Sequence, residues 1–105
     1  MPAHEHIHPD QFSQVEAISK RAEETTGHCA NCFAVSSGIE KHLGFEQAEG
    51  HYRGPEVNHK AVHAWNVHPS GTIIDATAQQ WNPKGERVRV IPKGDPRSKW
   101  YRRSV

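Results

Sequence analysis

Apolar residues near the N-terminus recur at the spacing of an amphipathic helix. Phe12, Val15 and Ile18 would share one face of such a helix. Pro9 is typical of a first helical turn, and Gly27 follows two β-branched threonines that disfavour helix. The pattern therefore predicts a first helix that starts near residue 9 and ends near residues 25–27.

A second apolar stripe, made of Phe33, Val35 and Ile39, follows the two cysteines of the chain. It predicts a helix over about residues 31–42, which a Leu-Gly pair closes. Gly38 lies inside this helix, where glycine costs roughly 1 kcal/mol relative to alanine. A glycine at such a position predicts the close approach of another backbone.

Beyond residue 44 the pattern changes to that of strands. Residues 45–53 are a weak, polar strand candidate. Residues 61–67 are a stronger one, and the turn His68-Pro69-Ser70-Gly71 joins them to a strand over residues 72–77. Residues 87–91 alternate charged and aliphatic side chains, as a half-buried strand does. The prolines and glycine that follow predict the end of regular structure.

This order of elements predicts an α+β fold, with two helices followed by three or four antiparallel strands. At 105 residues, the chain is one domain with a modest core. Residues 1–9 and 93–105 are predicted to be flexible or irregular ends. The second helix should pack on the sheet, so that its first residues face the strands.

The charge of the chain is unevenly distributed. Residues 1–50 carry eight acidic and three basic side chains, a balance of −5, and residues 51–105 carry ten basic and four acidic ones, a balance of +6. A solvated basic tail explains this excess, and a net charge of +1 does not favour nucleic-acid binding. No apolar run approaches the ~20 residues of a membrane span. Because the first residues also lack the pattern of a secretory signal, we expect a cytoplasmic protein.

Three segments carry the residue types of a nucleophilic site. Cys29 and Cys32 lie near the predicted start of the second helix, where unpaired N–H groups and the helix dipole lower a thiol pKa. His63 and Asp75 lie in the two strands of the predicted hairpin. An imidazole there could take the thiol proton while a carboxylate orients the ring. The register that would bring both onto one face is not fixed by the pattern.

These segments resemble a known family. Cys32-Phe33-Ala34-Val35-Ser36, His63-Ala64-Trp65 and Asp75-Ala76-Thr77-Ala78-Gln79-Gln80-Trp81 are similar to the transglutaminase-like branch of papain-fold cysteine enzymes, in particular its small bacterial and phage members. Ala76 stands where these members often have proline. The resemblance implies a papain-like fold and a Cys-His-Asp triad that hydrolyses or transfers amide bonds of a peptide or protein substrate through a thioester, without a metal or other cofactor.

The resemblance also suggests which residues do the chemistry. Its spacing favours Cys32 as nucleophile, with Ser36 four positions on, and leaves Cys29 as the alternative. The backbone N–H of Cys32 would be one oxyanion donor. The second donor could be Asn31, His28 or Gln80, and the sequence does not choose among them. Trp65 and Trp81 could cover the core or roof the site. The oligomeric state is not predicted.

Other functions remain open from the sequence. Cys29 and Cys32 form a CxxC pair that could serve thiol-disulfide exchange, although a predicted helix end precedes it where a thioredoxin-like protein has a strand. The same cysteines could bind zinc with His59 and His63, whose spacing suits a helix better than the predicted strand. A catalytically inactive binding module, or plain packing of buried cysteines, is the remaining alternative.

Overall fold

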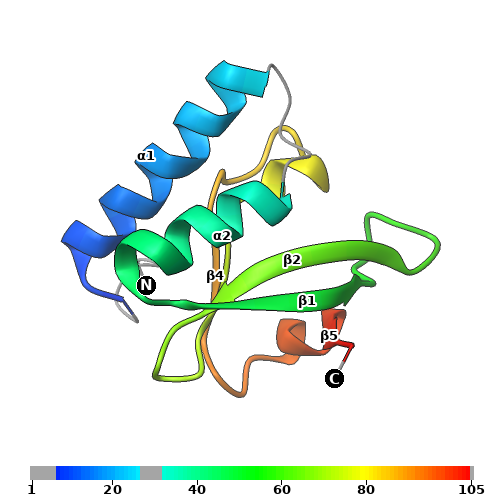
Figure 1. Cartoon of the computed structure of the whole chain (residues 1–105). Helices are drawn as coiled ribbons and strands as arrows, with labels where there is room; N and C mark the ends of the chain where they lie inside the picture. Colours follow the sequence, from blue (N-terminus) through cyan, green and yellow to red (C-terminus); the bar gives the residue numbers. More distant parts are fainter. Residues whose placement is uncertain (1–6, 27–31, 105) are drawn as a thin grey trace.

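The computed structural model describes residues 7–26 and 32–104, which form two α-helices and a five-stranded sheet (Figure 1). The helices are α1 (Pro9–Thr26) and α2 (Cys32–Leu43). The strands are β1 (Glu46–Tyr52), β2 (Ala61–Val67), β3 (Ile73–Asp75), β4 (Arg89–Ile91) and β5 (Tyr101–Arg103), and the short 3-10 helices are η2 (Ala78–Gln80) and η3 (Pro96–Trp100). The predicted α+β class and both predicted helices are confirmed.

The sheet is antiparallel and curled, with the strand order β4-β3-β2-β1-β5. α2 packs on β1 and β2, and α1 packs against α2 (Figure 1). Neighbouring strand residues alternate between two cores. Ile74 and Val90 belong to the core under the helices, whereas Ile73 and Ile91 contact the core on the opposite face. That second core is rich in aromatic rings, and we call it the aromatic core; its buried members are Ala48, Tyr52, Trp65, Ile91 and Tyr101.

The prediction of an irregular C-terminal segment is wrong for residues 96–103. These residues form η3 and then β5, which pairs with the outer edge of β1. Gly50 makes this pairing feasible, because a Cβ at that position would overlap the carbonyl oxygen of Arg102. The neighbouring basic residues Arg102 and Arg103 are exposed, but Tyr101 itself is buried in the aromatic core.

Two smaller predictions also differ from the structure. A Cβ built on Gly38 would lie 3.6 Å from the side chain of Ile18, an ordinary contact, so the predicted close approach of another backbone is wrong. The strand predicted over residues 87–91 covers only Arg89–Ile91. All three of its residues are buried, and Arg89 is only 7% exposed, so this strand is not half-buried.

Candidate active site

Cys32 is the first residue of α2 and is 5% exposed. Side-chain hydrogen bonds fix the backbone of this first turn. The Ser36 hydroxyl donates to the Cys32 carbonyl at 2.6 Å, and the Gln47 amide donates to the Ser36 hydroxyl at 2.9 Å. Because the first N–H groups of a helix have no intrahelical acceptor, a thiolate at this position is favoured by their partial positive charge.

The imidazole of His63 lies against this thiol. β3 pairs with β2 only at Asn66 and Val67, and β2 also packs against α2. The ring of His63 and the backbone of Ala64 lie close enough to the Cys32 thiol to lower its pKa. Burial raises the pKa of the Cys32 thiol, but the proximity and the charge of His63 lower it more, so the net pKa is below that of an ordinary cysteine.

Asp75 approaches the other side of the same ring. His63 Nε2 lies 3.1 Å from Asp75 Oδ2, and both side chains have an exposed fraction of 0%. The N–H of Nε2 is not aligned with this oxygen well enough for a hydrogen bond, so the contact is an ion pair. Ile74 pairs with Asn66, and the next residues in this register are Asp75 and Trp65. Asp75 therefore shares the sheet face of Trp65 and His63.

Charge attraction between the two residues governs their protonation. Burial lowers the pKa of His63, but the neighbouring carboxylate of Asp75 raises it by more, so that the pKa is about 9. Burial likewise raises the pKa of Asp75, and the charge of His63, with hydrogen bonds to the carboxylate, lowers it below its ordinary value. At neutral pH the pair is therefore imidazolium and carboxylate.

Asp75 is held by hydrogen bonds at both carboxylate oxygens. Oδ2 accepts from the Tyr101 hydroxyl at 2.6 Å and from Trp81 Nε1 at 3.1 Å. Oδ1 accepts from the Thr77 backbone N–H at 3.1 Å and from its hydroxyl at 3.3 Å. A carboxylate with this many donors has little freedom to rotate, so its position beside His63 is fixed.

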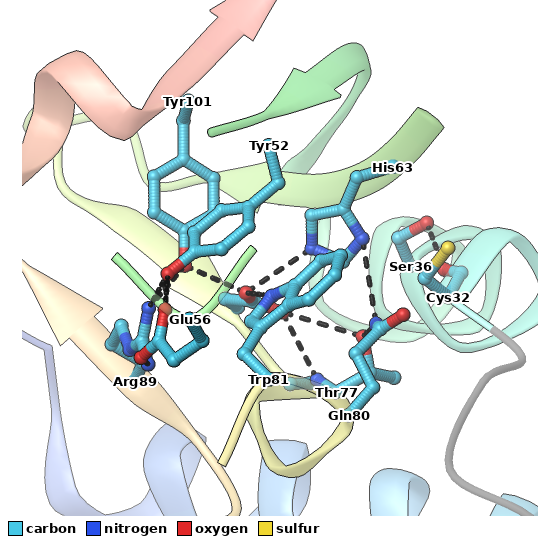
Figure 2. Close-up of polar contacts among 12 residues, drawn as sticks. Cys32, Ser36, Tyr52, Glu56, His63, Thr77, Gln80, Trp81, Arg89 and Tyr101 are labelled. Carbon is cyan, nitrogen blue, oxygen red and sulfur yellow. Dashed lines mark hydrogen bonds and ion pairs between the residues drawn. The ribbon is translucent and has the colours of Figure 1, made fainter. Parts of the chain in front are cut away.

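Gln80 lies beside the nitrogen of His63 that does not face Asp75. Its Nε2 is 3.4 Å from His63 Nδ1 and donates to the Thr77 hydroxyl at 2.8 Å. Figure 2 shows this amide next to the histidine, with Cys32 at the start of α2 on the same side. Of the sequence-predicted oxyanion donors, Gln80 is thus brought to the Cys32–His63 pair.

Aromatic rings surround the histidine. The Trp65 ring is stacked against it at 5.8 Å between centroids, and the Trp81 ring meets it edge-on at 4.9 Å. Tyr52 in turn stacks on Trp81 at 4.1 Å. Trp65 is a buried member of the aromatic core, whereas Trp81 also donates a hydrogen bond to Asp75. Trp65 therefore contributes to packing, and Trp81 helps to hold the carboxylate.

Comparisons with family models, curated proteins and solved structures found no match to this chain. The candidate site is therefore interpreted from its own geometry. Cys29, Asn31 and His28 lie outside the described residues. α1 ends at Thr26, so a helix comes before the cysteine pair, as the sequence predicts.

The alternatives of disulfide exchange and of a zinc site both involve Cys29, which lies outside the described residues. Among residues 7–26 and 32–104, no three His, Cys, Asp or Glu side chains are grouped to hold a metal ion. His59 is exposed and contacts Asn58 rather than His63.

Neither α-helix in the described part of the chain has the length and apolar character to cross a membrane.

Sequence reasoning missed four polar side chains near the site, namely Tyr52, Glu56, Arg89 and Tyr101. They come from β1, the β1–β2 connection, β4 and β5, so no local motif contains them. The one available signal was an arginine flanked by aliphatic residues in a strand, and it is equally typical of a solvent-facing position.

Proposed function

We propose that this protein is a cysteine-dependent acyl-transfer enzyme of the transglutaminase-like, papain-like type, which hydrolyses an amide or isopeptide bond in a peptide or protein. One observation carries the proposal. The thiol of Cys32, at a helix N-terminus, lies close enough to the ring of His63 for the ring to lower its pKa, and Nε2 of that ring pairs with the buried carboxylate of Asp75. This is the order of nucleophile, base and orienting group that thiol catalysis requires.

The two ring nitrogens would have separate tasks. Nε2 faces Asp75, so Nδ1 is the nitrogen available to the thiol of Cys32. Because His63 is imidazolium at neutral pH, Nδ1 already holds the proton of the thiol, and the Cys32 thiolate attacks the carbonyl carbon of the substrate amide. Nδ1–H then protonates the leaving nitrogen as the C–N bond breaks, which leaves a thioester on Cys32. His63 next takes a proton from water, which attacks the thioester, and release of the thiolate beside the protonated ring restores the starting ion pair.

The developing oxyanion needs donors near Cys32. The backbone N–H of Cys32 is one, and Gln80 supplies a second. Gln80 uses one amide hydrogen on Thr77, and the other points toward Nδ1, which accepts only while it is unprotonated. Because His63 is imidazolium at neutral pH, Nδ1 carries a proton and this second amide hydrogen has no acceptor there. It is then available to the substrate oxygen at the step where negative charge develops there.

Acylation by an activated ester tests this proposal. Wild type, Cys32→Ala and Cys29→Ala would each be mixed with p-nitrophenyl acetate, and the acetyl group located by mass spectrometry of the intact protein and its peptides. We expect a rapid burst of p-nitrophenol and a hydroxylamine-sensitive acetyl group on Cys32, in wild type and in Cys29→Ala alike.

Two results would contradict the proposal. Equal acylation of Cys32→Ala would show that another group reacts. Acylation of Cys32 that His63→Ala leaves unchanged would show that the thiol is not activated by the histidine. In either case the chain would be better described as a binding module with a buried cysteine.

A further inference from the structure

Four side chains form a polar cluster, which Figure 2 shows on the opposite side of His63 from Cys32. We call it the tyrosine–arginine network, and its members are Tyr52, Glu56, Arg89 and Tyr101. Arg89 occupies its centre, with Nη1 donating to the Tyr52 hydroxyl at 2.7 Å and to the Tyr101 hydroxyl at 3.3 Å. Nη2 pairs with Glu56 at 3.1 Å, and the Tyr52 hydroxyl also donates to Glu56 at 2.5 Å.

The direction of the hydrogen bonds in this network is fixed by chemistry. Arginine can only donate, so the hydroxyl oxygens of both tyrosines accept from Arg89. Each hydroxyl has one hydrogen to give. Tyr52 gives its hydrogen to Glu56, and Tyr101 gives its hydrogen to Asp75. The chain of donation therefore runs from Arg89 through Tyr101 to Asp75, and each bond polarises the next.

Charge and burial agree with this direction. Arg89 is a nearly buried cation that lies opposite Asp75 in the pairing of β3 with β4, forms an ion pair with Glu56 and reaches Asp75 through the Tyr101 hydroxyl. Burial, with a hydrogen bond to Glu56, raises the pKa of Tyr52 to about 12. Burial and the charge of Asp75 raise the pKa of Tyr101 as well. Both phenols are therefore neutral hydrogen-bond donors, and neither takes the place of His63 as a base.

We propose that Tyr101 and Arg89 are positioning residues, which keep Asp75 ionised and directed at His63 and so set the lower pH limit of Cys32 reactivity. The inference rests on the proposed function for its consequence in catalysis, but not for the state of Asp75 itself. Charged or titratable groups reach the His63–Asp75 pair from four elements: Cys32 from α2, Tyr52 from β1, Arg89 from β4 and Tyr101 from β5.

The two tyrosines offer a matched test. Tyr101→Phe and Tyr52→Phe each remove one hydroxyl that accepts from Arg89, but only Tyr101 contacts Asp75. The pKa of the Asp75 carboxyl would be measured by carbon-13 NMR, and the pH dependence of Cys32 alkylation would be followed in a Cys29→Ala background. A hydrogen bond to a charged group corresponds to roughly one to two pH units. We expect Tyr101→Phe to raise the Asp75 pKa, and the acid limb of alkylation, by about that amount.

Tyr52→Phe should leave both quantities near their wild-type values. Equal profiles for the two variants and wild type would overturn the inference and make the network purely structural. If Tyr101→Phe does not fold, Arg89→Lys decides, because it keeps the charge but has one nitrogen for the contacts that Arg89 makes with two. It should raise the Asp75 pKa as well, and no shift would overturn the inference.

The two readouts separate this inference from the proposed function. The carboxyl pKa is measured without any reaction at Cys32. If wild-type Cys32 is unreactive while Tyr101→Phe still shifts the Asp75 pKa, the proposed function fails and the positioning of Asp75 stands. If Cys32 is reactive and neither Tyr101→Phe nor Arg89→Lys changes the Asp75 pKa, the proposed function stands and the positioning role of Tyr101 and Arg89 is refuted.

Discussion

Replacing Asp75 with asparagine removes one buried charge and almost preserves the shape of the side chain. The carboxylate accepts hydrogen bonds at both oxygens, whereas an amide has only one acceptor oxygen. The amide oxygen would best face Tyr101 and Trp81, which leaves its NH2 group against the backbone N–H of Thr77. The variant therefore loses the ion pair with His63 and one backbone hydrogen bond.

The expected effect on His63 is large. Without the carboxylate charge, burial dominates and lowers the His63 pKa from about 9 to below its ordinary 6.5. Without a charged His63, burial raises the pKa of the Cys32 thiol, although loss of the Asp75 charge acts the other way. An ordinary cysteine, with a pKa of ~8.5, is ~1% thiolate at pH 6.5. If the wild-type thiol is ionised at that pH, the thiolate fraction falls by up to ~100-fold. Because a more basic thiolate is more nucleophilic, the alkylation rate should fall by about tenfold or more.

The assay is alkylation by iodoacetamide, an uncharged reagent, in a Cys29→Ala background across the pH range. Trypsin releases the peptide between Arg21 and Lys41, which carries Cys32, for mass spectrometry. Asp10→Asn is the matched control, since it makes the same chemical change in a side chain that is 87% exposed. The reasoning is refuted if Asp75→Asn, folded as judged by circular dichroism, alkylates at the wild-type rate at pH 6.5.

Three further predictions follow from the same structure. In Cys32→Ala, the carboxylate of Asp75 still raises the His63 pKa above its ordinary 6.5, whereas the part contributed by Cys32 is lost. The stabilisation from this shift is fully present below pH ~6.5 and is lost as the pH rises toward about 9. Urea unfolding should show a decrease of less than ~3 kcal/mol over this range, which Cys32→Ala/His63→Ala lacks. Gly50→Ala should detach β5 and lower the free energy of unfolding by about 1–3 kcal/mol, whereas an unchanged urea midpoint would contradict the close contact with Arg102. Gln80→Ala should slow acylation of Cys32 by p-nitrophenyl acetate about 100-fold if its amide is an oxyanion donor, and a rate within twofold of wild type would exclude that role.

The positions of the proposed triad were accessible from sequence because each residue sits in a strong local pattern. Cys32 begins a helix with a clear apolar stripe, and His63 and Asp75 lie on strands joined by a short turn. The sequence could not choose the register of this hairpin, because a one-residue slip reverses the faces of a strand. The structure has the register in which both residues share one face.

Arg89 shows why the surrounding network was not predicted. Alternation in this strand correctly separates Val88 and Val90, under the helices, from Arg89 and Ile91 on the other face. That second face is covered by aromatic rings from β1, η3 and β5, and Trp100 lies 5.7 Å from the Arg89 guanidinium. The covering elements are distant in sequence, and the basic composition of the C-terminal segment predicted solvent there. Burial of Arg89 is thus a tertiary property that local pattern does not encode.

The most direct test of the proposed catalytic pair is the pKa of Cys32 itself. It can be measured from the ultraviolet absorbance of the thiolate, as the difference between Cys29→Ala and Cys29→Ala/Cys32→Ala, with and without His63→Ala. Burial and His63 act on this thiol in opposite directions. An activated pair predicts a pKa below the ~8.5 of a free cysteine, which rises above that value when His63 is removed. A pKa above ~8.5 in both proteins would mean that Cys32 is a buried, inert thiol and would contradict the proposed function.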